Sequence, residues 1–272
     1  MNTWYAERDE PAPPRPDAAG WLRVGLRGPA LAVLVFGGLV LLILVRLVEW
    51  PLFRHRRPVT LYITQAVCRG GLRILGLRCT VIGPAIRSGA MVANHSSWLD
   101  ILVLNAAARV TFVSKAEVAR WPGIGWLARA TGTLFIRRAR AEARDHSAAI
   151  HDRLELGQLL LIFPEGTSSD GLQVLPFKPT VFEPLLNGNM NDDARVQPAS
   201  VIYHAPIGRP SDFYGWWGDM ALAPHLLAVL AERRSGRVTL RLHQPLDGSI
   251  FVNRKLLAKA AEDSVRSGFE GR

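Results

Sequence analysis

The sequence predicts an α/β protein with a mixed, mainly parallel sheet flanked by helices, behind an N-terminal two-helix membrane motif. From residue 79 onward, short apolar runs alternate with helical patterns, which is typical of parallel strands joined by covering helices. In residues 21–78 the most apolar stretch and most of the chain's net positive charge coincide. We therefore divide the 272-residue chain into a disordered tail (1–20), a membrane-associating anchor (21–78) and an α/β domain (79–272).

The charge distribution separates the tail from the anchor. Residues 1–20 are rich in proline and carry a net charge of −2, a composition that favours disorder. Residues 21–80 contain nine arginines and a single acid, Glu49, so they hold most of the net charge of +10. A basic segment that is also strongly apolar favours an anionic membrane surface over nucleic acid as its partner.

Two helices are expected in the anchor. Gly28–Val45 is an uncharged run of 18 residues, flanked on both sides by arginines and by Trp21 and Trp50 as interfacial anchors. Val59–Leu77 is a second helical stretch, with Arg69 and Arg73 on one face. Because both flanks of the first helix are basic, its orientation is open, and so is the choice between spanning the bilayer and dipping into it.

The α/β domain is expected to contain seven strands and several helices. The apolar runs that predict strands are Cys79–Ile82, Ala90–Ala93, Val110–Ser114, Thr133–Ile136, Leu159–Phe163, Ala199–Tyr203 and Val238–Leu242. The helical patterns are Trp98–Ala108, Glu117–Ala130, Arg140–Leu156 and Asn253–Ser267. Residues 183–195 and 204–225 have the composition of loops.

A histidine and an aspartate follow the second predicted strand, within Asn94-His95-Ser96-Ser97-Trp98-Leu99-Asp100. His95 precedes a helix and Asp100 lies in its first turn, so the carboxylate can reach back to the imidazole. A carboxylate on one ring nitrogen leaves the other nitrogen as a competent base. Taken alone, a histidine near an aspartate is more often structural, so this pair needs support from the rest of the chain.

Two further polar blocks also follow predicted strands. In Phe163-Pro164-Glu165-Gly166-Thr167-Ser168, Gly166 permits close backbone approach to a ligand and Glu165 is placed to orient a substrate hydroxyl. In Gly132-Thr133-Leu134-Phe135-Ile136-Arg137-Arg138, a strand ends in two arginines that suit phosphate or carboxylate. A tight turn and a surface charge pair are the simpler explanations of each block alone.

Taken together and in this order, the blocks resemble the lysophosphatidic acid (1-acylglycerol-3-phosphate) acyltransferase family. That family is marked by N-H-x4-D, G-x-x-F-I-x-R, F-P-E-G-T-R and V-P-x, and the last block corresponds here to Val196-Gln197-Pro198. The resemblance covers about residues 59–245 and implies the glycerolipid acyltransferase fold. It implies that His95 and Asp100 form a catalytic dyad without a covalent acyl-enzyme. It also implies that Glu165, Gly166, Thr167 and Arg137 or Arg138 hold the acceptor.

One position departs from the family pattern, because Ser168 stands where the family has the arginine after E-G-T. That change argues against a phosphate-bearing acceptor. The segments Ser168–Lys178 and Tyr214–Met220 look similar to a bacterial branch that acylates lyso-ornithine lipid, an aminolipid without phosphate. We therefore favour lyso-ornithine lipid or a similar lysolipid slightly as acceptor, with 1-acyl-sn-glycerol-3-phosphate as the alternative.

The expected reaction needs a thioester donor and no cofactor or metal. His95 takes the proton of the acceptor hydroxyl as it attacks acyl-CoA or an acyl group on acyl carrier protein. Backbone N–H groups near Gly166 are candidates for stabilising the oxyanion, and Lys115 and Arg120 for contacting donor phosphates or the membrane. The expected location is the cytoplasmic face of a bacterial inner membrane, with membrane lipids as partners.

Two other classes of protein remain as alternatives. A metal-dependent membrane hydrolase would use His95, Asp100, His146 and His151, although the last two are five residues apart and do not share a helix face. A non-enzymatic basic membrane adaptor would be indifferent to the loss of His95. Three ordered motifs favour the acyltransferase over both.

Overall fold

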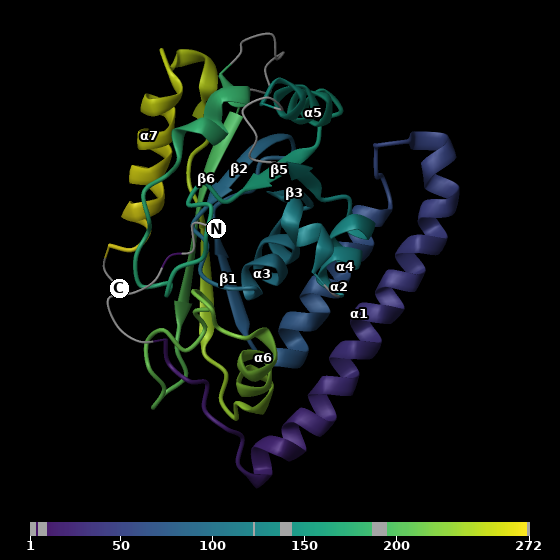
Figure 1. The fold of residues 1–272 in the computed structure, drawn as a ribbon, viewed down its shortest axis with the longest axis vertical. Coiled ribbons are helices and arrows are strands. Elements are labelled where there is room, and N and C mark those ends of the chain that lie inside the picture. Colours follow the sequence, from purple (N-terminus) through teal and green to yellow (C-terminus); the bar gives the residue numbers. More distant parts are fainter. Residues whose placement is uncertain (1–3, 5–9, 122, 137–142, 187–194, 271–272) are drawn as a thin grey trace.

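The fold is a twisted sheet between two layers of helices, seen in a computed structural model that describes residues 4, 10–121, 123–136, 143–186 and 195–270 (Figure 1). The strand order is β1-β7-β6-β2-β5-β3-β4, and β8 pairs with β6. Pairing is parallel except where β6 meets β7 and β8. The strands are β1 Arg78–Ile82, β2 Gly89–Ala93, β3 Val110–Lys115, β4 Leu134–Ile136, β5 Leu159–Ile162, β6 Arg195–His204, β7 Arg237–Leu242 and β8 Leu246–Asp247. The predicted mainly parallel sheet is confirmed.

Both faces of the sheet are covered by helices (Figure 1). Along β2, Met91 and Ala93 pack with α2, α3 and α6, while Ala90 and Val92 pack with α5 and α7. All five residues of β2 are buried, which is why the strand is an unbroken apolar run rather than an alternating one. The helices are α1 Ala18–Phe53, α2 Thr60–Leu75, α3 Leu99–Ala107, α4 Ile124–Thr131, α5 Ala143–Glu155, α6 Leu222–Ala231 and α7 Arg254–Ser267.

Each predicted strand is present, and four details differ from the prediction. The strand β6 begins four residues earlier, at Arg195, and the short β8 and the helix α6 were not predicted. The single helix expected over Glu117–Ala130 is wrong: a 3-10 helix, η1 (Ala116–Arg120), precedes α4. Trp121 is extended (φ −70°, ψ 130°) because it precedes a proline in the sequence, and Gly123 has φ 72°. These two residues end one helix before the next begins.

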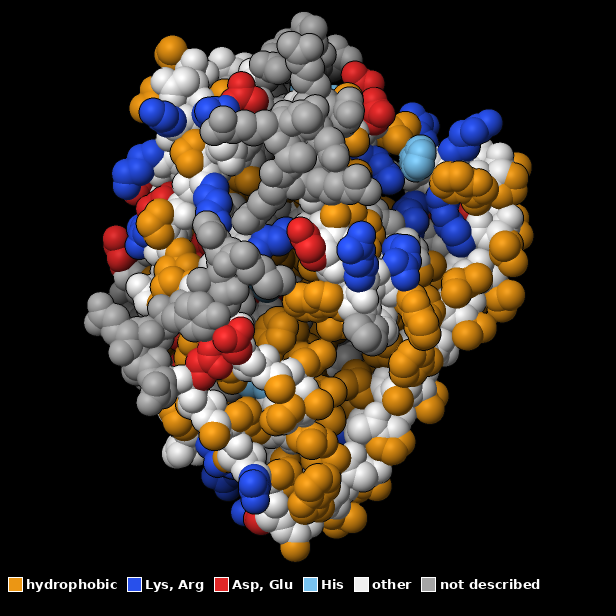
Figure 2. Space-filling model, in the orientation of Figure 1, with side chains coloured by type: hydrophobic (Ala, Val, Ile, Leu, Met, Phe, Trp, Pro, Cys, Tyr) orange, Lys and Arg blue, Asp and Glu red, His pale blue; other side chains and the backbone are white. Residues whose placement is uncertain are grey.

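The first helix is twice as long as the apolar run that predicted it. It has 36 residues, which corresponds to about 54 Å, and Asp17 caps its first turn by accepting from Gly20 N at 2.6 Å. Among the described residues, α1 is the one helix long and apolar enough to cross a membrane, and only 6% of its most apolar window is buried. Figure 2 shows hydrophobic side chains along its outer side. The exposed members include Leu26, Val33, Phe36, Val40, Leu44 and Leu47.

Close helix packing joins α1 to α2. Gly38 of α1 lies against Val67 and Gly70 of α2 lies against Leu34, and a Cβ at either glycine would come within 2.4 and 2.8 Å of these side chains. The two helices therefore approach more closely than larger residues permit. Because α2 also packs on α3, α1 is held against the α/β layer along its length.

A buried carboxylate locks the turn between these two helices. Glu49, near the end of α1, is 4% exposed, and its Oε1 accepts from Val59 N (2.8 Å) and Thr60 N (3.2 Å). Its Oε2 accepts from Thr60 Oγ1 at 2.7 Å and pairs with Arg46 at 3.1 Å. The N-cap residue of α2, Val59, has no side-chain acceptor of its own. Glu49 thus supplies from α1 the cap that α2 lacks.

We expect Glu49→Ala to lower the free energy of unfolding by about 1–3 kcal/mol, because the first donors of α2 lose their acceptor inside the protein. The measurement is denaturant unfolding in detergent solution. Glu155→Ala is the matched control, since Glu155 is an exposed glutamate in the last turn of α5. Equal stabilities for the two variants would contradict the capping role of Glu49.

Candidate active site

The candidate site lies where the parallel strands β2 and β5 end side by side. Val92 of β2 is in register with Ile162 of β5, so the segments that follow both strands leave the sheet at the same edge. His95 comes two residues after β2 and Glu165 three residues after β5. This edge is where α/β proteins place their ligands.

His95 and Asp100 are in direct contact, as the spacing predicted. His95 Nδ1 lies 2.7 Å from Asp100 Oδ2. The imidazole is 22% exposed and the carboxylate is fully buried. Because the carboxylate holds the proton of Nδ1, Nε2 is left unprotonated and able to accept a proton. The pair therefore has the geometry of a general base and its orienting group.

The carboxylate of Asp100 is saturated with donors. Oδ2 also accepts from the backbone N–H groups of Ser96 (2.8 Å) and Ser97 (3.0 Å), which precede the first turn of α3. Oδ1 accepts from the hydroxyl of Tyr203 at 2.7 Å. Burial and the negative charge of Asp100 hold the pKa of Tyr203 well above its ordinary value, so the phenol stays protonated and donates.

Sequence reasoning missed Tyr203. The strand pattern marked it as a core residue of β6, and nothing in its spacing points to the catalytic turn 103 residues earlier. A polar hydroxyl at a fully buried strand position was the one available signal, because such a group needs a hydrogen-bond partner.

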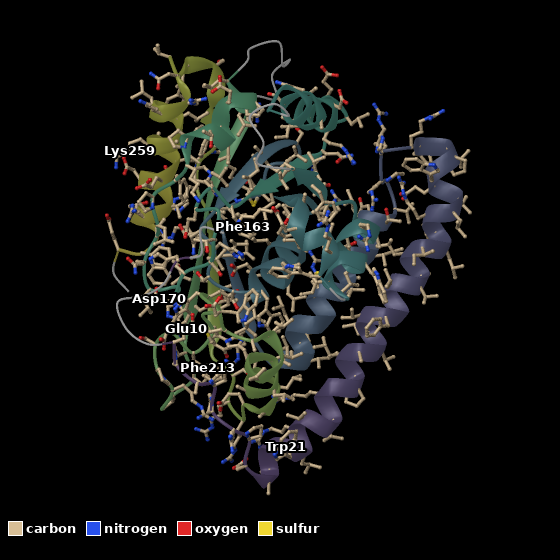
Figure 3. All side chains as sticks on the ribbon, in the orientation of Figure 1. Glu10, Trp21, Phe163, Asp170, Phe213 and Lys259 are labelled. Carbon is tan, nitrogen blue, oxygen red and sulfur yellow. The ribbon has the colours of Figure 1, made fainter. Side chains whose placement is uncertain are left out.

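The segment after β5 holds the backbone of His95 in place. Glu165 Oε1 accepts from His95 N at 3.2 Å, and Ser169 N donates to His95 O at 2.9 Å. Phe163 stacks on the imidazole with ring centroids 4.1 Å apart and planes 14° apart. Figure 3 labels Phe163 and Asp170 of this segment. The two motifs that were recognised separately in the sequence thus form one structural unit.

Glu165 lies deeper than expected. Its side chain is 2% exposed, and burial raises the pKa of its carboxyl well above the usual range. One oxygen bonds His95 N, and the other, Oε2, is buried without a hydrogen-bond partner in the part of the chain that the structure describes. The observed contacts make Glu165 a positioning residue for His95. Its role toward the acceptor stays a prediction.

The other residues predicted to contact substrate are placed less fully. Gly166 has φ 70°, and its N–H donates to Phe163 O at 3.1 Å, which closes the tight turn named above as the simpler explanation of this block. Thr167 is half-buried on the rim, where its Oγ1 accepts from Trp4 N at 3.4 Å. Lys115 ends β3 at the same sheet edge. Arg137 and Arg138 lie outside the described residues, so their roles stay predictions.

An aromatic segment from far along the chain forms one wall of the site. Trp216 N donates to Ser96 O at 2.8 Å, and its ring meets Trp121 edge-on with centroids 6.3 Å apart. A Cβ on Gly215 would lie 2.7 Å from Asp170 O, so this segment packs tightly on the loop after Glu165. The segments Ser168–Lys178 and Tyr214–Met220, noted together in the sequence, therefore meet beside the catalytic turn.

A metal site is not found among the described residues, where no group of three or more His, Cys, Asp or Glu side chains is placed to hold an ion. The side chain of His146, one of the four residues of the hydrolase alternative, lies outside that set.

Comparisons with known proteins identify the family. Residues 83–202 match the family model described as Acyltransferase. The chain is 53% identical to a lyso-ornithine lipid O-acyltransferase from Rhodobacter capsulatus, over 96% of this chain and 95% of the relative. It is 30% identical to a 1-acyl-sn-glycerol-3-phosphate acyltransferase from Neisseria meningitidis serogroup B, over 73% of this chain and 77% of that protein.

A solved structure shares the fold. The crystal structure of the 1-acyl-sn-glycerophosphate (LPA) acyltransferase from Thermotoga maritima matches with a TM-score of 0.55 and 24% identity, over 90% of this chain and 96% of that one. The lipid acyltransferase relatives and the exposed apolar face of α1 together indicate membrane association. With a relative 53% identical across nearly the whole of both chains, this chain belongs to the acyltransferase family and is an acyltransferase enzyme rather than a hydrolase or an adaptor.

Proposed function

We propose that this enzyme transfers a fatty acyl group from acyl carrier protein or coenzyme A to the hydroxyl of lyso-ornithine lipid. The observation that carries the proposal is the 53% identity to a lyso-ornithine lipid O-acyltransferase over almost the entire chain. Relatives with the same description in Rhizobium meliloti and Pseudomonas aeruginosa are 34% and 36% identical. The donor thioester enters as a substrate, and the chemistry requires no cofactor.

In the proposed reaction, a C–O bond replaces the C–S bond of the thioester, and one proton passes from the acceptor hydroxyl through His95 to the leaving thiolate. His95 Nε2 takes the proton of the acceptor hydroxyl while its oxygen forms a bond to the thioester carbonyl carbon. The C–S bond then breaks, and the leaving thiolate recovers the proton from His95. The Asp100 carboxylate, 2.7 Å from Nδ1, stabilises the imidazolium between these two events.

The acceptor assignment depends on which charged residues lie in the segment that follows Glu165. Ser168 replaces the arginine that suits a phosphate, so the guanidinium that the family pattern places here is missing. The one basic residue of the segment Ser168–Lys178 is Lys178, ten residues after Ser168. The loss of the arginine favours an acceptor without phosphate. The 30% identity to a 1-acyl-sn-glycerol-3-phosphate acyltransferase keeps lysophosphatidic acid as the second candidate acceptor.

The attachment of α1 favours a helix that lies in the membrane surface over one that spans the bilayer. Near its start, Arg27 donates to Leu230 O (3.0 Å) and Glu232 O (2.7 Å) at the end of α6. Near its end, Glu49 is bound to Thr60. These two attachments are about 33 Å apart along the helix, comparable to the hydrocarbon thickness of a bilayer, and both lead to the same α/β body. A spanning helix would draw that body into the bilayer.

The proposed location is the cytoplasmic face of a bacterial inner membrane. Thioesters of coenzyme A and acyl carrier protein are supplied on that side, and the outward apolar face of α1 would enter the lipid interface. Exposed basic residues at its end, Arg54 and Arg56, suit anionic headgroups.

We expect His95→Ala to reduce acyl transfer by a factor of about 10²–10⁴, because the hydroxyl loses its general base. Transfer of labelled acyl groups to lyso-ornithine lipid measures the effect, and vesicle binding should be unchanged. His151→Ala is the control, since His151 is a half-buried histidine on α5, outside the site. Wild-type turnover in the His95 variant would rule out the mechanism.

We expect the wild-type enzyme to acylate lyso-ornithine lipid in preference to lysophosphatidic acid when both are offered with the same labelled donor. Ser168→Arg should move the ratio of kcat/KM values toward lysophosphatidic acid by about tenfold, because a guanidinium would pair with the phosphate. Ser147→Arg, on α5, controls for the added charge. Exclusive use of lysophosphatidic acid by the wild type would overturn the acceptor assignment.

We expect single cysteines at the two ends of α1 to be labelled from the same side of a vesicle. Leu22→Cys and Leu52→Cys suit this test because both side chains are exposed, at 67% and 69%. An impermeant maleimide reports accessibility, in a background where the half-buried Cys79 is replaced by alanine. Labelling of the two positions from opposite sides would establish a spanning helix instead.

A further inference from the structure

The dyad has a third hydrogen-bonded member. We infer that Tyr203 is a positioning residue for acyl transfer, which holds Asp100 through its hydroxyl and thereby sets the basicity of His95. The inference rests on the proposed function, because it assigns Tyr203 a role in the same proton transfer. The hydroxyl lies 2.7 Å from Asp100 Oδ1, and Tyr203 and Asp100 are 4% and 0% exposed.

The sheet register places Tyr203 over the catalytic turn. The strands β2 and β6 are parallel, with Ala93 opposite Ala199. β2 ends at Ala93, while β6 continues for five more residues to His204. Tyr203 therefore stands beyond the end of β2, on the same face of the sheet as Ala199 and Val201, where α3 packs. The ring reaches the carboxylate at the first turn of that helix.

The two oxygens of Asp100 are held by different parts of the fold. Oδ2 accepts from His95 and from two backbone N–H groups of its own turn, at 2.7 to 3.0 Å. In the described part of the chain, Tyr203 is the donor to Oδ1. The tyrosine therefore fixes the rotation of the carboxylate plane from outside the turn, which local contacts to Oδ2 alone do not do.

A hydrogen bond from Tyr203 also draws negative charge away from His95. Without this bond the carboxylate is more basic, pulls harder on the Nδ1 proton and stabilises the imidazolium at rest. His95 then stays protonated up to a higher pH, where it cannot act as a base. Tyr203 thus limits the pull of Asp100 on the Nδ1 proton while leaving the carboxylate able to stabilise the cation formed during transfer.

The other titratable groups around Tyr203, Asp100 and His95 would remain in place in a variant of Tyr203. Glu165 approaches from the segment after β5, through its bond to His95 N. Cys79 of β1 and Tyr214 are also neighbours of Tyr203, and the ring centroid of Tyr214 is 5.6 Å from that of Tyr203. A change in the pH dependence on removing one hydroxyl is therefore assigned to the bond between Tyr203 and Asp100.

The test compares Tyr203→Phe with Tyr214→Phe. Tyr214 is the matched control because it is equally buried (2% exposed) and its hydroxyl accepts from Gly236 N at 2.8 Å rather than contacting Asp100. We expect Tyr203→Phe to move the acid limb of the kcat/KM profile upward by about half to one pH unit, and so to lower kcat/KM about 3-fold to 10-fold at pH values below that limb. Tyr214→Phe should leave the acid limb in place.

Two readouts separate this inference from the proposed function. In Tyr203→Phe, the midpoint of the His95 ring titration, followed by NMR, should move upward by about half to one pH unit, as predicted for the acid limb of the kcat/KM profile. This measurement needs no substrate. A wild-type enzyme that transfers acyl groups, with a His95 titration unchanged by Tyr203→Phe, would overturn the inference alone. A shifted titration in a protein that fails to acylate lyso-ornithine lipid would overturn the proposed function alone.

A second substitution tests the same hydrogen bond without removing the hydroxyl, in case Tyr203→Phe is unstable. Replacing the four tyrosines of the chain by 3-fluorotyrosine makes the phenol a stronger donor without removing it. The acid limb and the His95 titration should then move downward, and the shift should persist when the substitution is repeated in Tyr214→Phe. An upward shift, or none, would contradict the inference.

Discussion

The carboxylate of Asp100 is the group on which the catalytic turn depends. It accepts from the backbone of Ser96 and Ser97, from His95 and from Tyr203, all within 3.0 Å. A buried anion is tolerated only when its oxygens are paired, and here three donors come from the catalytic turn and one from β6. The turn, the helix α3 and the strand β6 therefore fix one another, and the orientation of the imidazole follows from that arrangement.

The loop after β5 completes what Asp100 begins. Asp100 holds the ring nitrogen of His95, while Glu165 and Ser169 hold its backbone N–H and C=O. Phe163 covers one face of the ring, so the histidine is constrained in position, tilt and tautomer. This arrangement explains how two motifs 70 residues apart form one site, because each is incomplete without the other. Preorganisation of this kind lowers the cost of reaching the transition state.

The sequence predicted best what depends on local spacing. The contact between His95 and Asp100 was predicted because His95 precedes a helix and Asp100 lies in its first turn. The strands β2 and β5 were predicted from uninterrupted apolar runs. The sequence did not predict contacts between distant residues, because a strand pattern indicates that Tyr203 is buried without indicating which residue its hydroxyl contacts. Glu49 was hidden for the same reason, since its acceptor role depends on how α1 and α2 pack.

Membrane attachment and catalysis meet through a continuous stack of helices. The outward face of α1 is apolar, α2 packs behind it, and α3, which carries Asp100, packs behind α2. A helix lying in the interface would therefore hold the catalytic turn at a fixed depth relative to the lipid surface. The imidazole is 22% exposed, and Phe163 covers one of its faces. Restricted access matters for this chemistry, because a water molecule activated by His95 would hydrolyse the thioester instead of leaving it for the lipid hydroxyl.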